Sequence, residues 1–206
     1  VNQALVCFQC GSHGHCGSIR AATTQGRNVA IGVNPLKAGY DDQALYYMSR
    51  VYNFMNKPND RIQSLTDLIN NYPKSRYLQR AILEVARAYF EVENMDKSER
   101  YYKQFIADFP SSTSVKDAYH YLGDIAFKRA NFNQAETYYT KVLNEFTIND
   151  TICEREVSSL VSVYRAQRLL NKIELLAGKY SCADSIATQV EDEYYRLGFD
   201  QYDKSE

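Results

Sequence analysis

The sequence predicts an all-α protein, an α-solenoid of stacked antiparallel helix pairs. Two observations carry this prediction. A pattern returns every 37 residues, so that Pro73 is repeated at Pro110 and Tyr101 at Tyr138. Over residues 41–148, apolar side chains also follow helical spacing. A fixed period of this length is typical of supersecondary units that bury their apolar faces only by stacking on one another.

The composition is that of an ordinary globular chain, and it restricts the expected partners. Of the 206 residues, 45% are hydrophobic and 24% are charged, and the net charge is -1. A nearly neutral chain is not expected to bind nucleic acid or an anionic membrane broadly. No run approaches the ~20 apolar residues of a membrane-spanning helix. We therefore expect membrane association only through partners or through an anchor outside this sequence.

The first predicted domain, residues 1–40, has no clear period. Six glycines punctuate it, and residues 18–32 have the polar composition of a loop. The helical repeat domain is predicted over residues 41–206. It opens at Asp41 and Asp42, two acids that are well placed to cap a helix N-terminus.

Three regular helix pairs are predicted over about 41–75, 76–112 and 113–150. Each pair has an apolar stripe, a short break and a second stripe. The first stripes begin with Ala44, Leu45 and Met48, with Leu78, Ala81 and Ile82, and with Ala118, Tyr119 and Leu122. The breaks fall at Pro58-Asn59-Asp60, Asn94-Met95-Asp96 and Asn131-Phe132-Asn133. Small residues are expected to let adjacent helices approach closely at Ala86, Gly123 and Ala135.

A fourth, longer unit is predicted over 151–200. Residues 156–177 have the pattern of one long helix, and residues 178–183 resemble the turn of the third pair. Because this resemblance matches Ala183 to Ala135, the fourth unit is expected to be clearly longer than the period of the other three. Its second helix is expected over 181–197, and a turn-like ending suggests that the natural chain continues beyond Glu206.

These units resemble tetratricopeptide repeats. The third unit has the family's helix-packing residues at Tyr119, Leu122, Gly123, Ala126, Ala135 and Tyr139. The first unit departs from the family at Arg61, where the family has Ala, so a looser first pairing is expected. The resemblance implies a right-handed solenoid that binds other proteins. The 37-residue period and the ending Phe109-Pro110-Ser111-Ser112 are similar to the bacterial cell-envelope branch, which includes the Tol-Pal accessory protein and the outer-membrane assembly lipoprotein.

The resemblance also implies a groove lined by the first helix of each pair. Carried over position by position, the groove residues are Tyr46, Arg50 and Asn53, then Leu83, Arg87 and Phe90, then His120, Asp124 and Phe127. Arg50 and Arg87 are equivalent positions, and two guanidinium groups suit a carboxylate or an acidic peptide. The alternative is that these side chains are solvated arginines and seam-packing aromatics.

A cysteine-histidine cluster near the start of the chain is the one stretch with the chemistry of a metal site. Cys7, Cys10 and His15 are similar to the opening of a zinc knuckle, but the knuckle's last Cys position holds Arg20 and the available thiol is Cys16. Zinc could take Cys7, Cys10, Cys16 and either His15 or His13. The alternative is a flexible Cys- and His-rich tail. The remaining cysteines, Cys153 and Cys182, are expected to be buried small hydrophobic residues.

The leading hypothesis is a non-enzymatic scaffold that binds a protein or peptide in its groove, with no bound cofactor and no nucleic acid. Its expected place is the bacterial periplasm or the periplasmic face of the outer membrane, and a cytoplasmic location stays compatible with the sequence. The alternative is a zinc-knuckle-like module with a nucleic-acid or regulatory role. An enzyme is disfavoured, because neither a phosphate-binding Gly loop nor a metalloprotease His-Glu motif occurs.

Overall fold

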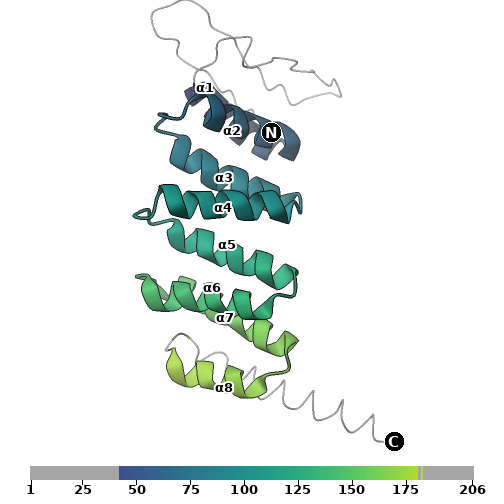
Figure 1. Ribbon diagram of the computed structural model, residues 1–206, viewed down its shortest axis with the longest axis vertical. Helices are drawn as coiled ribbons and strands as arrows, with labels where there is room; N and C mark the ends of the chain where they lie inside the picture. The colour runs from purple at the N-terminus through teal and green to yellow at the C-terminus, as the bar shows by residue number, and fades with distance from the viewer. Residues whose placement is uncertain (1–41, 181, 183–206) are drawn as a thin grey trace, which may run out of the picture. The chain divides into compact units, whose positions relative to one another are not determined.

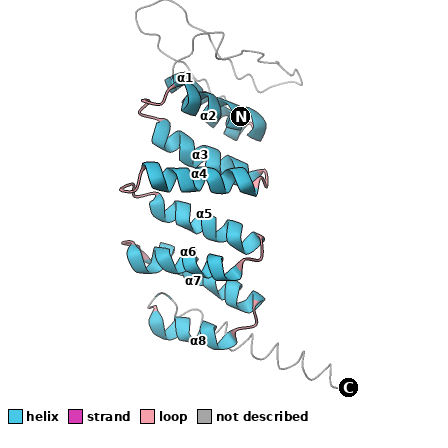
Figure 2. Ribbon diagram, in the orientation of Figure 1, coloured by secondary structure: helices cyan, strands magenta, loops and turns pink. Residues whose placement is uncertain are grey.

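A computed structural model of the chain describes residues 42–180 and residue 182. This part folds into eight α-helices and contains no strand (Figures 1 and 2), which confirms the all-α prediction. The helices are α1 (Asp42–Phe54), α2 (Pro58–Asn71), α3 (Leu78–Glu91), α4 (Met95–Asp108), α5 (Val115–Lys128), α6 (Phe132–Glu145), α7 (Asp150–Ala166) and α8 (Leu170–Lys179). None of these helices is long and apolar enough to cross a membrane. The predicted N-terminal domain, residues 1–40, lies outside the described residues, and the division at residue 40 stays a prediction.

The 37-residue period appears directly in the helix boundaries. The helices α3 and α5 have 14 residues each and begin 37 residues apart, at Leu78 and Val115. The second helices α2, α4 and α6 also have 14 residues each and begin at Pro58, Met95 and Phe132, again 37 residues apart. The repeat seen in the sequence is therefore a repeat of whole helix pairs, stacked in chain order (Figure 1).

The turn inside each helix pair uses one left-handed residue. These residues are Asn56, Glu93, Ala130 and Arg168, with φ between 53° and 60°. The next backbone N–H bonds back across the turn to the carbonyl five residues earlier, as Asn94 bonds to Tyr89 and Asn131 to Ala126. This bond closes the end of the first helix in the manner of a Schellman motif. The side chains of Asn94 and Asn131 then cap the second helices by accepting from the backbone N–H of Lys97 and Gln134.

The core is a chain of three clusters that share helices. The first joins α1, α2 and α3, the second joins α3, α4 and α5, and the third joins α5 to α8. Within α3, Ala81 and Val85 belong to the first cluster, whereas Ile82 and Ala86 belong to the second. No helix pair closes a core alone, which is the physical reason why repeats of this kind exist only as stacks.

The fourth helix pair differs from the prediction. A single helix over 156–177 is wrong, because the chain turns after α7 at Arg168, where φ is 60°. The Leu169 N–H bonds to the Tyr164 carbonyl, as in the earlier turns. Gly178, expected in a turn, lies inside α8. The step from the turn at Ala130 to the turn at Arg168 exceeds the period by only one position, so the expected lengthening of this unit is wrong. The helix expected over 181–197 falls outside the described residues.

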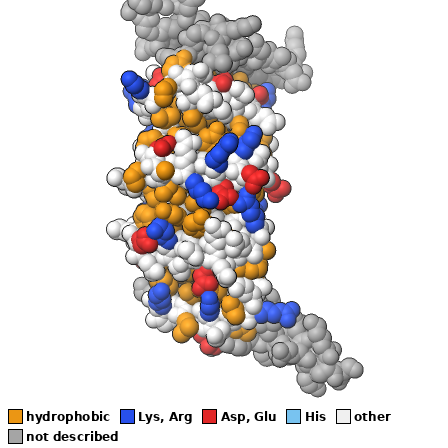
Figure 3. Space-filling model, in the orientation of Figure 1, with side chains coloured by type: hydrophobic (Ala, Val, Ile, Leu, Met, Phe, Trp, Pro, Cys, Tyr) orange, Lys and Arg blue, Asp and Glu red, His pale blue; other side chains and the backbone are white. Residues whose placement is uncertain are grey.

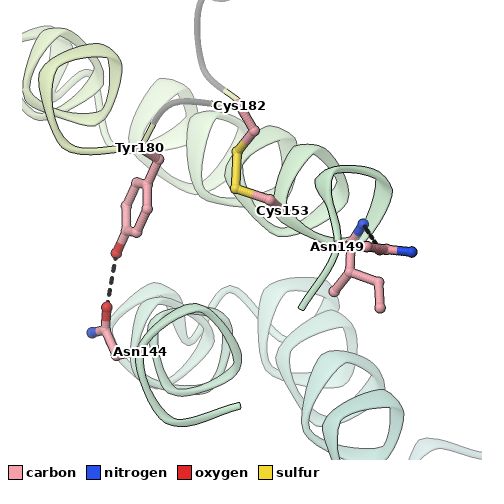
Figure 4. Close-up of a disulfide and its surroundings, with 6 residues drawn as sticks. Asn144, Asn149, Cys153, Tyr180 and Cys182 are labelled. Atoms are coloured by element: carbon pink, nitrogen blue, oxygen red, sulfur yellow. Dashed lines mark hydrogen bonds between the residues drawn. A yellow bond between two sulfur atoms is a disulfide. The ribbon is translucent and has the colours of Figure 1, made fainter. Parts of the chain in front are cut away.

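The two later cysteines form a disulfide, so the prediction of buried free thiols is wrong. Cys153 lies in α7, Cys182 follows α8, and their Cα atoms are 6.0 Å apart (Figure 4). The turn at Arg168 is the physical reason, because it sends α8 back along α7 and returns the chain to Cys153. Nearby, the Tyr180 hydroxyl group donates to the Asn144 side chain at 3.1 Å, which ties the end of α8 to α6.

Candidate functional site

The predicted groove residues lie on α1, α3 and α5, the first helices of the first three pairs. These three helices and α7, the first helix of the fourth pair, are here called the first-helix series. From α3 to α7, side chains of successive members contact one another directly. Arg87 and Phe90 of α3 reach Tyr121 of α5, and His120 of α5 reaches Glu156 of α7. The first-helix series therefore presents side chains from consecutive repeats as one surface.

The α1 part of this surface contains one buried and two exposed predicted residues. Tyr46 is only 5% exposed and stacks on Tyr77 with ring centroids 4.8 Å apart. Its ring belongs to the first core cluster and leaves little surface for a partner. Arg50 and Asn53 are exposed.

The α3 part is an aromatic and basic patch centred on Tyr121. The Arg87 guanidinium lies 5.4 Å from the centre of the Tyr121 ring, a cation–π distance, and the Phe90 ring meets the same ring edge-on at 5.5 Å. Lys128 lies over the Phe90 ring at 5.0 Å. Leu83, Arg87 and Phe90 are half-buried. This patch combines rigid aromatic rings with cations, a combination common among the residues that dominate binding energy at interfaces.

Arg87 remains a cation in this setting. Burial alone would lower its pKa, but Tyr121, Tyr102 and Glu84 outweigh burial and raise it. The Arg87 Nε is buried and has no hydrogen-bond partner in the described part of the chain. The Arg87 side chain as a whole is half-buried, so a carboxylate from outside is expected to approach its terminal nitrogens and not the buried Nε.

The α5 and α7 part carries acids that are already paired. His120 Nδ1 lies 3.0 Å from the Glu156 carboxylate, and His120 Nε2 lies 3.5 Å from Asp124. Arg155 binds Glu156 at 2.8 Å and Asp117 at 3.4 Å. This network links α5 to α7 and satisfies its own charges. The spacing of His120 and Asp124 on one helix predicts a surface pair, and the structure adds the buried Glu156.

Two equivalent tyrosines show how the surface changes character along the stack. Tyr102 and Tyr139 occupy the same repeat position and are both buried. The Tyr139 hydroxyl donates to Asp124 at 2.7 Å, whereas the Tyr102 hydroxyl finds no hydrogen-bond partner among the described residues and interacts with Arg87 electrostatically. Burial raises the pKa of both phenols, so both stay protonated. The second repeat therefore presents a cation where the third presents an anion.

Figure 3 shows apolar side chains gathered over the middle helices of one face, with acidic and basic side chains next to one another beside them.

Phe127, the last predicted groove residue, is half-buried and packs on Phe132 with ring centroids 5.7 Å apart. Outside the first-helix series, Arg129 pairs with Asp96 and Glu99 across neighbouring repeats.

Arg61 shows why the first pairing tolerates a charge where the family has Ala. It is 3% exposed and binds Glu91 at 2.7 Å and Glu84 at 3.1 Å, so α2 is tied to α3 by two ion pairs. Both acids are partly exposed, which limits the cost of desolvation. The sequence showed that Arg61 departs from the family pattern, but it did not show that Glu84 and Glu91 would pair with it.

The predicted zinc ligands Cys7, Cys10, His15 and Cys16 lie outside the described residues, as does His13. Zinc binding there stays a prediction that elemental analysis of the purified protein decides. Within residues 42–180 and at 182, no group of three or more His, Cys, Asp or Glu side chains could hold a metal ion.

Comparison with solved structures finds the same fold in proteins of low identity. A putative kinesin light chain with TPR-like repeats from Podosopora anserina matches with a TM-score of 0.60 and 13% identity, over 79% of this chain and 89% of that one. The Pseudomonas aeruginosa pilF product matches with a TM-score of 0.51 and 11% identity, over 84% and 70%. BtubC from P. vanneervenii matches with a TM-score of 0.58 and 14% identity over 75% of this chain, which spans 64% of the length of BtubC.

These matches, together with the helix-pair stack, confirm a TPR-like solenoid. Among curated proteins, no sequence matches. The family model described as outer membrane lipoprotein, YfiO, matches residues 41–173, from the start of α1 into α8. That span covers most of the chain and includes all of the contacts within the first-helix series described above. The chain therefore belongs to the YfiO outer membrane lipoprotein family.

Proposed function

We propose that the chain is a non-catalytic scaffold that binds a protein or peptide segment along the first-helix series, as part of a bacterial envelope assembly. The observation that carries the proposal is the continuous surface of α3 and α5, where Arg87 and Phe90 meet Tyr121. Its rings and guanidinium group are held in place by packing before a partner arrives, and such preorganisation lowers the entropic cost of binding.

The proposed location is the periplasm or the periplasmic face of the outer membrane. Family membership supports an envelope role. The Cys153–Cys182 disulfide supports an oxidising compartment, since such bonds persist in the periplasm and are rare in the cytosol. One structural neighbour, PilW, is described as a type IV pilus biogenesis factor, which is a property of that protein and an analogy for this one.

The test is capture of partners from the native source, with identification by mass spectrometry. The double variant Arg50→Glu/Arg87→Glu is expected to lose the captured partner, because it reverses both charges at the equivalent groove positions. The single variant Arg50→Glu is also tested, because Arg50 is exposed and its replacement is not expected to disturb folding. The control is Arg100→Glu, which makes the same charge change on an exposed position of α4. Partner capture that survives both groove variants at wild-type yield counts against the proposal.

A further inference from the structure

Three basic side chains, Arg50 of α1, Arg76 in the connection before α3 and Arg80 of α3, lack the acidic partners that the α5–α7 part possesses. Among the described residues, neither Arg50 nor Arg80 forms an ion pair, and Arg76 binds only the Tyr77 hydroxyl and ring. By contrast, Asp117 and Glu156 are held by Arg155. The stack therefore has a self-neutralised part and a part with positive charge to spare.

A cavity of 710 Å³ lies where this spare charge is concentrated. It is formed by the connections that lead into α3 and α5, together with Tyr47 of α1. Its lining includes Arg76, Arg80, Gln79 and the hydroxyl groups of residues 112–114, and it includes no Asp or Glu. A lining of guanidinium, amide and hydroxyl donors without a carboxylate is chemically suited to an anion.

The spacing of the two arginines on α3 indicates whether the ligand is a single small anion or a chain that carries two acidic groups. Arg80 and Arg87 lie seven residues apart, two helical turns, so they share one face at a separation of about 10 Å along the axis. Half-buried Leu83 lies between them. Glu84, the acid on this stretch, is engaged by Arg61 at 3.1 Å. A single phosphate or carboxylate cannot span both guanidinium groups, whereas two carboxylates on one chain can.

A polyproline-type extended segment repeats its side-chain direction every third residue and rises about 3.1 Å per residue. Two acids three residues apart on such a segment therefore point the same way at a separation of about 9 Å, which matches the arginine spacing.

We propose that the partner is an extended segment with the motif acid-x-x-acid, with one carboxylate in the cavity at Arg76 and Arg80 and the other on Arg87. This inference rests on the proposed scaffold function and names the chemistry of its ligand.

The test uses the full chain and three fluorescein-labelled peptides in fluorescence anisotropy at low salt. The first contains Glu-Pro-Leu-Glu, the second contains Gln-Pro-Leu-Gln, and the third contains Glu-Glu-Pro-Leu, which keeps the charge and composition but not the spacing. The first peptide is expected to bind about fivefold more tightly than either of the others, the scale of a correctly placed exposed ion pair. Equal affinity for the first and third peptides overturns the spacing argument.

The matched variants are Arg80→Gln, in the cavity, and Arg100→Gln, on α4. Both positions are exposed, and both changes remove one positive charge. Arg80→Gln is expected to weaken binding of the first peptide about fivefold and to leave the melting temperature unchanged, while Arg100→Gln changes neither. If the two variants lose affinity for the first peptide equally, the binding comes from general charge attraction, and the proposed site at Arg80 is wrong.

Two further arms distinguish other anions from an acidic peptide. Displacement of the first peptide by equimolar inorganic phosphate, or Arg80-dependent binding to phosphatidylglycerol vesicles without peptide binding, overturns the assignment to an acidic protein segment. The experiments also distinguish a failure of this inference from a failure of the proposed scaffold function. If the peptides fail while Arg50→Glu/Arg87→Glu still loses the native partner, only this inference falls. If native capture is also unaffected, the groove proposal falls with it.

Discussion

At the scale of single residues, Gly123 shows how the sequence sets the distance between helices. A Cβ at this position would lie 2.4 Å from Tyr139 Cε1 and 2.8 Å from two further ring atoms. The Tyr139 ring is 2% exposed and its hydroxyl is tied to Asp124, so it has no open side to move to. The small residue expected at this helix contact is confirmed, and its partner is identified as the ring of Tyr139.

Gly123→Ala is therefore expected to lower the free energy of unfolding by about 1–3 kcal/mol, the usual cost of overpacking a well-packed core. Urea denaturation measures this change. Gly178→Ala is the control, because a Cβ there meets nothing within 4 Å and Ala favours a helix over Gly by up to about 1 kcal/mol. A Gly123→Ala protein as stable as wild type would show that Tyr139 moves aside freely.

Asp124 gives the stack a pH dependence of defined sign. Burial raises its pKa above the ordinary 3.8, although His120 and the Tyr139 hydrogen bond act to lower it. The folded protein then holds this proton more tightly than the unfolded chain does. The stabilisation is complete below pH 3.8 and is lost as the pH rises through the raised pKa.

Asp124→Asn has no proton to lose at this position and keeps an oxygen that can accept from Tyr139. Its stability relative to wild type is therefore expected to increase as the pH rises from about 4 to 7. Chemical denaturation across this range measures the difference, and the same comparison in a His120→Gln background removes the neighbouring imidazole as a variable. A stability difference that stays constant with pH contradicts the prediction.

The sequence predicted which positions belong to the first-helix series, but it did not predict which of their side chains would be buried in the core. Tyr46 and Phe90 have the same aromatic character in the sequence, yet Tyr46 is buried and Phe90 is half-buried. Glu156 was missed because the expected register placed it at the start of a long helix. In the observed register Glu156 is the equivalent of Ala118, so it fills a core position that is Ala in the preceding repeats.

At the scale of elements, the turns explain both the success and the failure of the repeat analysis. Asn94 and Asn131 mark two turns because an Asn cap is visible in the sequence. The turn at Arg168 has no Gly, Pro or Asn, and its left-handed residue is an Arg, so only packing against the third pair reveals it. The Gly178 signal led to a later turn because Gly in the last turn of α8 has the same sequence appearance as Gly in a loop.

The Cys153–Cys182 disulfide is expected to stabilise the fourth helix pair. Its cysteines are 29 residues apart, and closing a loop of that length in the unfolded chain contributes about 3–4 kcal/mol in the chain-entropy model. Cys153→Ser/Cys182→Ser should show this loss in denaturation experiments, and a reducing agent should produce the same loss in the wild type.

The variant Cys7→Ser/Cys10→Ser/Cys16→Ser is the control, because it keeps the disulfide and should still respond to the reducing agent. Peptide mapping under non-reducing conditions tests the pairing directly. Free thiols at both positions in protein from an oxidising compartment would contradict it.

At the scale of the whole stack, stability is distributed unevenly because neighbouring pairs share one core. The central first helices α3 and α5 contain five and six buried residues, respectively, and each takes part in two core clusters. In α8, the buried hydrophobic side chains among those that the structure describes are Ile173 and Leu176. In a linear array, the free energy of local opening follows the interfaces that each element shares.

Hydrogen exchange is therefore expected to be slowest in α3 and α5 and fastest in α8 among the eight helices. Mass spectrometry of peptides from each helix measures the order. Because α8 lies inside the loop closed by Cys153 and Cys182, reduction should accelerate exchange in α8 and leave α3 unchanged. Uniform exchange along the stack, or equal acceleration in α3 and α8 on reduction, would mean that the stack opens as one cooperative unit and would contradict the nearest-neighbour description of its stability.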